Sequence, residues 1–277
     1  MKHLHAPWWL TPTLLLLLTT LSLPAQAAPP TDGRYAFMYR MTETIDAQAL
    51  AERLHRVILA DARSYYEYEA MHIQGAHSVP LEGGAFRARL DELREQHPSR
   101  PIIFYCNGSD CSLSFKAAFR AKQLGFNHVL AYPGGIMEWA DLYPNQTVMF
   151  GESPFRPELI IPQATYAQHT LDFEAFSNKA RQDALLVDVR NHYQRDGLAL
   201  LPFLARAIPL SNEDIDQAVR MAQEQGRTLL LQDADGHQAR WIQYRLVAQD
   251  FHDYFFLAGG VNGVLGEEQS AFAGDGR

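Results

Sequence analysis

The sequence is poor in cysteine: Cys106 and Cys111 are the only two among 277 residues. Two cysteines cannot form a disulfide scaffold or a four-cysteine zinc site. Positive charge is also in deficit, since 24 Lys and Arg residues face 32 Asp and Glu residues and the formal net charge is −8. Nucleic-acid-binding proteins usually carry a basic surface, so this charge argues against a nucleic-acid partner. Low-complexity segments are absent, and 47% hydrophobic with 20% charged residues is typical of a globular protein.

Long apolar runs are missing too, except near the N-terminus. There a weakly basic start is followed by the leucine run 14–18 and by an A-x-A sequence that ends at Ala27. This order is typical of a secretory signal peptide, so we predict that residues 1–27 are removed and that the protein is periplasmic or secreted. An uncleaved membrane anchor is the alternative, but Thr19 and Thr20 interrupt an apolar run that is short for a membrane span.

The most informative stretch begins at residues 102–105, four large apolar residues that predict a short buried strand. A polar loop then opens on Cys106, and the helix-forming run 112–124 follows, with Gly125 at the expected C-terminal cap. Cys106 would therefore lie at a strand end, just before a helix N-terminus. Free backbone N–H groups and the helix dipole favour a reactive thiolate with a depressed pKa there. The alternative is a buried structural cysteine.

Strand and helix patterns alternate along the chain, which predicts an α/β fold with parallel sheets covered by helices on both faces. The landmarks also repeat: Asp61 and Arg63 recur 127 residues later as Asp188 and Arg190, each pair after an apolar run. We interpret this as an internal duplication of one α/β domain.

After the predicted signal peptide at 1–27, the repeat predicts a first domain at 40–145, a proline-rich linker at 146–166 and a second domain at 167–270. The same offset from Cys106 leads to Asp233, which cannot carry sulfur. We therefore predict that the second domain is non-catalytic, with a structural, pocket-lining or partner-binding role.

Four segments resemble motifs of the rhodanese (sulfurtransferase) family in its tandem two-domain form. They are the D-x-R strand end at Asp61–Arg63, the segment Glu67–Ala76 with Met71 in place of the usual glycine, the six-residue loop Cys106–Cys111, and the G-G-[IV]-x-x-W ending at Gly134–Trp139. The resemblance implies two tandem rhodanese-like domains, each a parallel sheet with helices on both faces.

The same resemblance implies the chemistry. Cys106 would carry a sulfane sulfur as a persulfide, taken from a thiosulfate-like or 3-mercaptopyruvate-like donor and passed to a thiol or cyanide-like acceptor, with no cofactor and no metal. Arg63 would pair with Asp61 or orient the loop, or else bind substrate; His72 would tie its turn, and Trp139 would lie in the core. The loop residues that would surround the sulfur are Asn107, Gly108, Ser109, Asp110, Cys111 and Ser112.

Two loop positions depart from the family pattern. Asp110 is acidic, and Cys111 stands where arginine is common in single-domain members, so neither helps to bind thiosulfate. The loop is also too short, and lacks the arginine, for a related dual-specificity phosphatase. Cys111 has three interpretations: a disulfide with Cys106 as a resting or resolving state, a small buried residue, or half of a soft-metal pair without a third ligand.

Two alternative functions therefore stay open beside sulfur transfer. One is a thiol–disulfide oxidoreductase that uses Cys106 and Cys111. The other is a non-catalytic binding module, in which the duplicated fold would dock a periplasmic protein partner.

Overall fold

The computed structural model describes residues 36–82, 84–109, 111–190, 192–195, 200–201 and 204–266. The predicted signal peptide, 1–27, and the loop residue Asp110 lie outside these described residues. Within them, no helix has the length and the apolar character that crossing a lipid bilayer requires.

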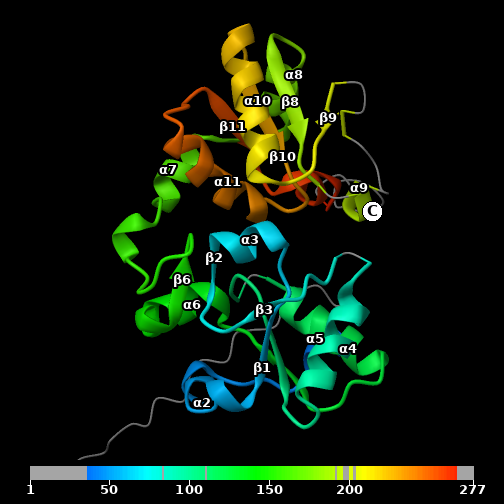
Figure 1. Cartoon of the computed structure of the whole chain (residues 1–277). Coiled ribbons are helices and arrows are strands. Elements are labelled where there is room, and N and C mark those ends of the chain that lie inside the picture. Colours follow the sequence, from blue (N-terminus) through cyan, green and yellow to red (C-terminus); the bar gives the residue numbers. More distant parts are fainter. Residues whose placement is uncertain are drawn as a thin grey trace, which may run out of the picture.

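The N-terminal unit, residues 36–149, occupies the lower half of Figure 1. Its elements are α1 Ala36–Met41, α2 Ala47–Ala51, the 3₁₀ helix η1 Leu54–Arg56, β1 Ile58–Asp61, α3 Tyr65–Ala70, β2 Met71–Ile73, β3 His77–Ser78, α4 Phe86–Gln96, β4 Ile102–Tyr105, α5 Leu113–Gln123, β5 Val129–Tyr132, α6 Gly135–Leu142, the 3₁₀ helix η2 Pro144–Gln146 and β6 Thr147–Met149.

The C-terminal unit, residues 170–266, lies above it and is reached through η3 Pro157–Leu159 and α7 Gln163–Gln168. Its elements are β7 Thr170–Leu171, α8 Phe173–Ala180, β8 Ala184–Asp188, α9 His192–Arg195, β9 Arg206–Ala207, α10 Asn212–Gln225, β10 Thr228–Gln232, α11 His237–Ala248 and β11 Tyr254–Leu257.

Both sheets are parallel and have the same strand order, which confirms the predicted α/β fold. The N-terminal order is β3-β1-β4-β5, and the C-terminal order is β9-β8-β10-β11 with β7 added at the edge. An isolated parallel bridge between Thr44 and Ala131 takes the place of β7 in the N-terminal unit. The carboxyl ends of β4 and β10 therefore occupy equivalent places in the two units.

Each sheet is buried on both faces, as the apolar runs predict. Along β4, Ile103 and Tyr105 pack toward α2 and α6, whereas Ile102 and Phe104 pack toward α4 and α5. The same alternation along β10 separates two apolar clusters in the C-terminal unit.

Local signals set several helix starts. Ser64 and Glu67 form a capping box at the start of α3, in which each side chain binds the other residue's backbone N–H. Asp46, Asp172 and Ser211 accept backbone N–H groups at the starts of α2, α8 and α10.

The predicted linker 146–166 is wrong for its first residues. The strand β6, Thr147–Met149, pairs antiparallel with β2 and so belongs to the N-terminal unit. The sequence pattern missed it because the strand has only three residues, and its buried residues Thr147 and Met149 pair with the distant Ile73 and Met71 of β2.

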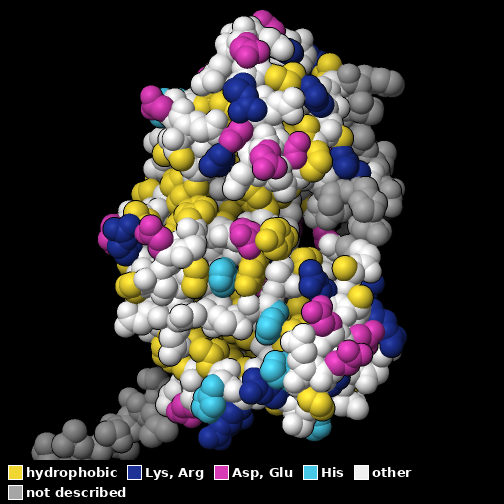
Figure 2. All heavy atoms as spheres, in the orientation of Figure 1, with side chains coloured by type: hydrophobic (Ala, Val, Ile, Leu, Met, Phe, Trp, Pro, Cys, Tyr) yellow, Lys and Arg dark blue, Asp and Glu magenta, His cyan; other side chains and the backbone are white. Residues whose placement is uncertain are grey.

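The two units pack through α3 and α11. Trp241 of α11 is buried in the core cluster of the N-terminal unit, and Tyr66 of α3 contacts the clusters of both units. Gln194 of α9 donates a hydrogen bond to Glu82 across the boundary. On the face shown in Figure 2, hydrophobic side chains gather along this boundary, as expected where two apolar surfaces meet.

Candidate active site

Cys106 follows the last residue of β4, at the carboxyl edge of the N-terminal sheet. It is only 1% exposed, and Cys111 is 5% exposed. A disulfide joins the two residues, whose Cα atoms are 6.3 Å apart. Of the three interpretations of Cys111, the structure shows the disulfide, so the thiolate predicted for Cys106 requires prior reduction.

Arg63 ties the end of β1 to this loop. Its guanidinium forms a buried ion pair with Asp61 at 2.6 Å, as the sequence predicted, and both side chains are fully buried. The same group donates to Asn107 Oδ1 at 3.1 Å and to the carbonyl oxygen of Met71. Burial alone would lower the pKa of Arg63, but the Asp61 carboxylate raises it above its ordinary value, so the charge is permanent. Arg63 thus orients the loop through its hydrogen bond to Asn107.

Glu67 holds the same loop residue from the other side. Its Oε1 accepts a hydrogen bond from Asn107 Nδ2 at 3.0 Å, while its Oε2 binds Ser64. Asn107 therefore uses both ends of its amide, one on Arg63 and one on Glu67. Sequence reasoning gave Glu67 no role, although the S-x-x-E capping pattern was a readable signal for its position.

The start of α6 holds the loop backbone. The N–H groups of Ile136 and Met137 donate to the carbonyl oxygens of Cys106 and Asn107 at 2.9 and 3.3 Å. Gly135 has a φ of +64°, and a Cβ there would lie 2.5 Å from both Cys106 O and Gly108 N. Only glycine fits this close approach, which explains the second glycine of the Gly134-Gly135 pair.

Residues 107–109 also line a cleft of about 650 Å³ between the two units. Among the described residues, no protein acceptor binds the backbone N–H groups of Asn107, Gly108, Ser109 or Ser112. The opposite wall comes from the C-terminal unit and includes Gly236 and Trp241. The loop can therefore offer several N–H donors to an anion that enters this cleft.

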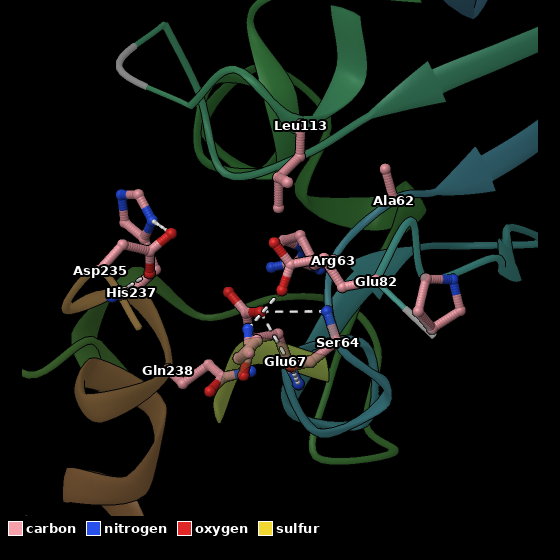
Figure 3. A pocket seen from close by; sticks show the side chains of 11 residues that line it. Ala62, Arg63, Ser64, Glu67, Glu82, Leu113, Asp235, His237 and Gln238 are labelled. Carbon is pink, nitrogen blue, oxygen red and sulfur yellow. Dashed lines mark hydrogen bonds and ion pairs between the residues drawn. The ribbon is translucent and has the colours of Figure 1, made fainter. Parts of the chain in front are cut away.

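A second, smaller cavity of about 30 Å³ lies beside the cleft, between α3 and the start of α11. Figure 3 shows Asp235, His237 and Gln238 on one side of it and Arg63 and Glu67 on the other. This volume suits one or two water molecules and is too small for an organic substrate.

Two structural predictions for single residues are confirmed. His72 Nδ1 lies 2.8 Å from the carbonyl oxygen of Tyr68, and Trp139 is fully buried. Met71, which replaces the family's glycine, is also fully buried, and its carbonyl oxygen accepts from Arg63.

The equivalent loop of the C-terminal unit has the same backbone hydrogen bonds as the Cys106 loop but carries different side chains. Val261 and Asn262 donate to the carbonyl oxygens of Asp233 and Ala234, as Ile136 and Met137 do in the first loop. Gly260, with φ of +60°, would place a Cβ 2.5 Å from Asp235 N.

The Asp233 side chain caps backbone N–H groups of its own loop and of the start of α11. Its carboxylate accepts the N–H groups of Gly236 and Ala239 at 2.7 and 2.9 Å. Burial and the neighbouring Asp235 raise its pKa to about 6. The residue that replaces the cysteine thus satisfies the backbone and offers no nucleophile.

Metal ligands do not gather in the part of the chain that the structure describes: no three His, Cys, Asp or Glu side chains lie close enough to hold an ion.

Comparison with known proteins gives a consistent result. Residues 46–142 match the family described as the rhodanese-like domain. The tRNA uridine(34) hydroxylase of Enterobacter sp. (strain 638) is 37% identical over 87 residues, which are 30% of this chain and 24% of that protein. The chain thus spans about a quarter of the length of such relatives.

Two solved structures are also similar. Thiosulfate sulfurtransferase from Pseudomonas aeruginosa is 24% identical, with 80% of this chain and 44% of that chain covered and a TM-score of 0.36. The rhodanese-like domain of an Anabaena sp. protein is 27% identical, with 41% and 83% covered and a TM-score of 0.35. Residues 46–142, which lie within the N-terminal unit, thus match the rhodanese-like domain.

Proposed function

We propose that this protein is a sulfurtransferase in which reduced Cys106 carries a sulfane sulfur as a persulfide. The observation that carries the proposal is the loop itself. Its side chains are clamped by Arg63 and Glu67 through Asn107, and its backbone is held by α6, while the N–H groups of residues 107–109 have no acceptor among the described residues. Such preorganised donors stabilise an anionic sulfur without a general base.

The reaction has two steps. The Cys106 thiolate attacks the outer sulfur of a donor such as thiosulfate. The sulfur–sulfur bond of the donor breaks, its electron pair leaves on sulfite, and Cys106 holds a persulfide anion. A thiol or cyanide-like acceptor then attacks the outer sulfur and restores the thiolate.

Intact mass spectrometry of the reduced protein tests this directly. Incubation with thiosulfate, and separately with 3-mercaptopyruvate, should add the mass of one sulfur atom. Cyanide should remove that mass, and Cys106→Ala should never acquire it. If neither donor adds sulfur to the reduced protein, the proposal fails.

The disulfide supports a second candidate, a thiol–disulfide oxidoreductase that cycles Cys106 and Cys111. Substitution of Cys111 by Ser separates the two functions. Persulfide formation should survive this change, whereas disulfide cycling with a dithiol substrate should stop. Retention of persulfide loading in Cys111→Ser would favour sulfur transfer.

The remaining parts of the proposal concern architecture and location. The shared strand order and the equivalent loops support duplication of one domain, with a C-terminal copy that has lost its sulfur. Cleavage after Ala27 would deliver the protein to the periplasm or the medium, which the mass of the exported protein tests.

We do not propose the hydroxylase activity of the relatives for this protein, because the matching region is about a quarter of their length and the net charge of −8 opposes RNA binding.

A further inference from the structure

The cleft beside Cys106 contains a cation that the active loop does not supply. Arg240 comes from α11 of the C-terminal unit and lines the same cleft as Asn107, Gly108 and Ser109. The residue as a whole is partly buried. Among the described residues it makes no hydrogen bond or ion pair, although arginine has five N–H donors to satisfy.

Three other titratable side chains line the cleft, Asp235, His237 and Glu138, and two of them pair with each other. His237 pairs with Asp235 at 3.1 Å. Although burial alone would raise the pKa of Asp235, the His237 contact and the charge of Lys116 lower it. The Glu138 carboxylate lies against Gly134, and burial together with Asp46 raises its pKa. Arg240 is thus the cation of the cleft that keeps its N–H donors for a ligand, whereas His237 is held by Asp235.

The walls of the cleft also suit a small organic anion. Tyr166 and Trp241 supply aromatic surface on the C-terminal side, and Met137 supplies apolar surface on the N-terminal side. Burial raises the pKa of Tyr166, and the Arg240 charge opposes this rise, as expected for a guanidinium near that wall. A volume of about 650 Å³ leaves ample room for a donor of a few heavy atoms.

We propose that Arg240 binds the anionic head group of the sulfur donor while Cys106 takes the donor's sulfur. The inference rests on the proposed function and assigns the sulfur-free unit a part in it: the unit without the nucleophile supplies the cation that the loop lacks at Cys111. The ligand class is a small molecule that carries its sulfur next to a carboxylate or a sulfonate-type group.

Alkylation of Cys106 tests the charge independently of sulfur transfer. In the reduced full-length Cys111→Ser protein, Cys106 is the single thiol. The rate at which it is alkylated can be measured with anionic iodoacetate and with neutral iodoacetamide. At low ionic strength, Arg240→Gln should lower the iodoacetate rate about fivefold or more relative to the iodoacetamide rate. Arg240→Lys should retain part of the difference.

Arg181→Gln is the matched control, because this exposed arginine lies at the end of α8 and does not line the cleft. It should leave the ratio of the two rates unchanged. If Arg240→Gln changes both rates in the same proportion, or no more than Arg181→Gln does, the inference is overturned.

Salt gives a second readout that needs no variant of Arg240. The chain carries a net charge of −8, so screening should raise the rate of an anionic reagent unless a local cation attracts it. With Arg240 in place, added salt should lower the iodoacetate rate; a rise would contradict the inference.

Measuring persulfide formation on Cys106 then separates this inference from the proposed sulfurtransferase function. Arg240→Gln should slow persulfide formation with whichever of thiosulfate and 3-mercaptopyruvate carries the recognised head group. Sulfur loading that is indifferent to Arg240 with both donors would overturn the inference and leave the sulfurtransferase intact. Charge selection by Arg240 without sulfur loading from either donor would overturn the sulfurtransferase and the donor-binding role of Arg240, and would leave only an anion site beside Cys106.

Discussion

The two loops at the ends of β4 and β10 share a backbone and differ in what their side chains do. In both, two N–H groups at the helix start that follows the next strand bind loop carbonyl oxygens, and a glycine with positive φ allows the close approach. In both, a buried Asp–Arg pair closes the end of the neighbouring strand. The backbone arrangement is thus a structural solution that persists without the sulfur.

The differences lie in three side chains that surround the sulfur position. Asp233 stands for Cys106, Ala234 for Asn107 and Gln194 for Glu67. Without the asparagine, no hydrogen bond joins the Arg190 side chain to a loop side chain among the described residues; Arg190 donates to the carbonyl oxygen of Gln194 instead. The clamp on the loop therefore accompanies the nucleophile, which indicates that it serves the reaction more than the fold.

The largest expected effect comes from the buried arginines. Arg63→Met leaves the Asp61 carboxylate buried without its cation and should cost about 3–5 kcal/mol of unfolding free energy. Arg190→Met should cost less, because Gln232 Nε2 still donates to Asp188 at 3.0 Å. Urea unfolding measures both, and an equal loss in the two variants would contradict the comparison.

The glycines test the shared backbone. Gly135→Ala and Gly260→Ala each force a Cβ to within 2.5 Å of loop backbone atoms at positive φ. Each should cost roughly 2–4 kcal/mol of stability. Only Gly135→Ala should also slow persulfide formation at Cys106, so an equal loss of activity in Gly260→Ala would show that the C-terminal loop acts in the reaction.

Asp233 gives the C-terminal unit a pH dependence that the first loop lacks. Its carboxyl group ionises near 3.8 when unfolded and at about 6 when folded, because of burial and Asp235. The unfolded chain therefore releases this proton first, and stability should fall as the pH rises from about 4 to about 6, by up to about 3 kcal/mol.

Asp233→Asn removes this titration. The difference in melting temperature between wild type and Asp233→Asn, measured from pH 4 to pH 8, should change across that window and be flat above it. Parallel curves for the two proteins would exclude a raised pKa for Asp233. Other carboxyl groups contribute to both curves and cancel in the difference.

The smallest expected effect on stability comes from Asn107→Ala. This change puts into the N-terminal loop the residue that the C-terminal loop has at the equivalent position, Ala234. The loss of two hydrogen bonds to buried charged groups should cost about 1–2 kcal/mol. Cys106 should nevertheless load sulfur more slowly, because its loop is held by the backbone alone. A double-mutant cycle with Glu67→Gln isolates the clamp, and additive effects would show that Asn107 and Glu67 do not act together.

The sequence was sufficient for the parts that depend on short-range pattern. Apolar runs predicted β1, β4, β8 and β10 because a parallel strand is buried on both faces and shows it as a continuous apolar segment. The helix-forming run 112–124 predicted α5, which the structure places at Leu113–Gln123. The pairing of Arg63 with Asp61 was one of the roles that the family resemblance implied, and the structure contains it.

What the sequence missed depends on contacts between distant segments. The strand β6 is recognisable only beside β2. Glu67 and Asn107 are 40 residues apart and meet because α3 and the β4 loop lie at the same sheet edge. Arg240 belongs to a helix whose own loop has no sulfur, so no local pattern connects it with Cys106.

The sequence by itself determined the α/β architecture, with Cys106 and Asp233 each directly after a buried strand, because strand burial and loop order depend on consecutive residues. Only the tertiary structure decided that Arg63 and Glu67 hold Asn107 between them and that the C-terminal unit covers the cleft with Arg240. Those contacts join segments far apart in the chain, and the packing of α3 against α11 brings them together.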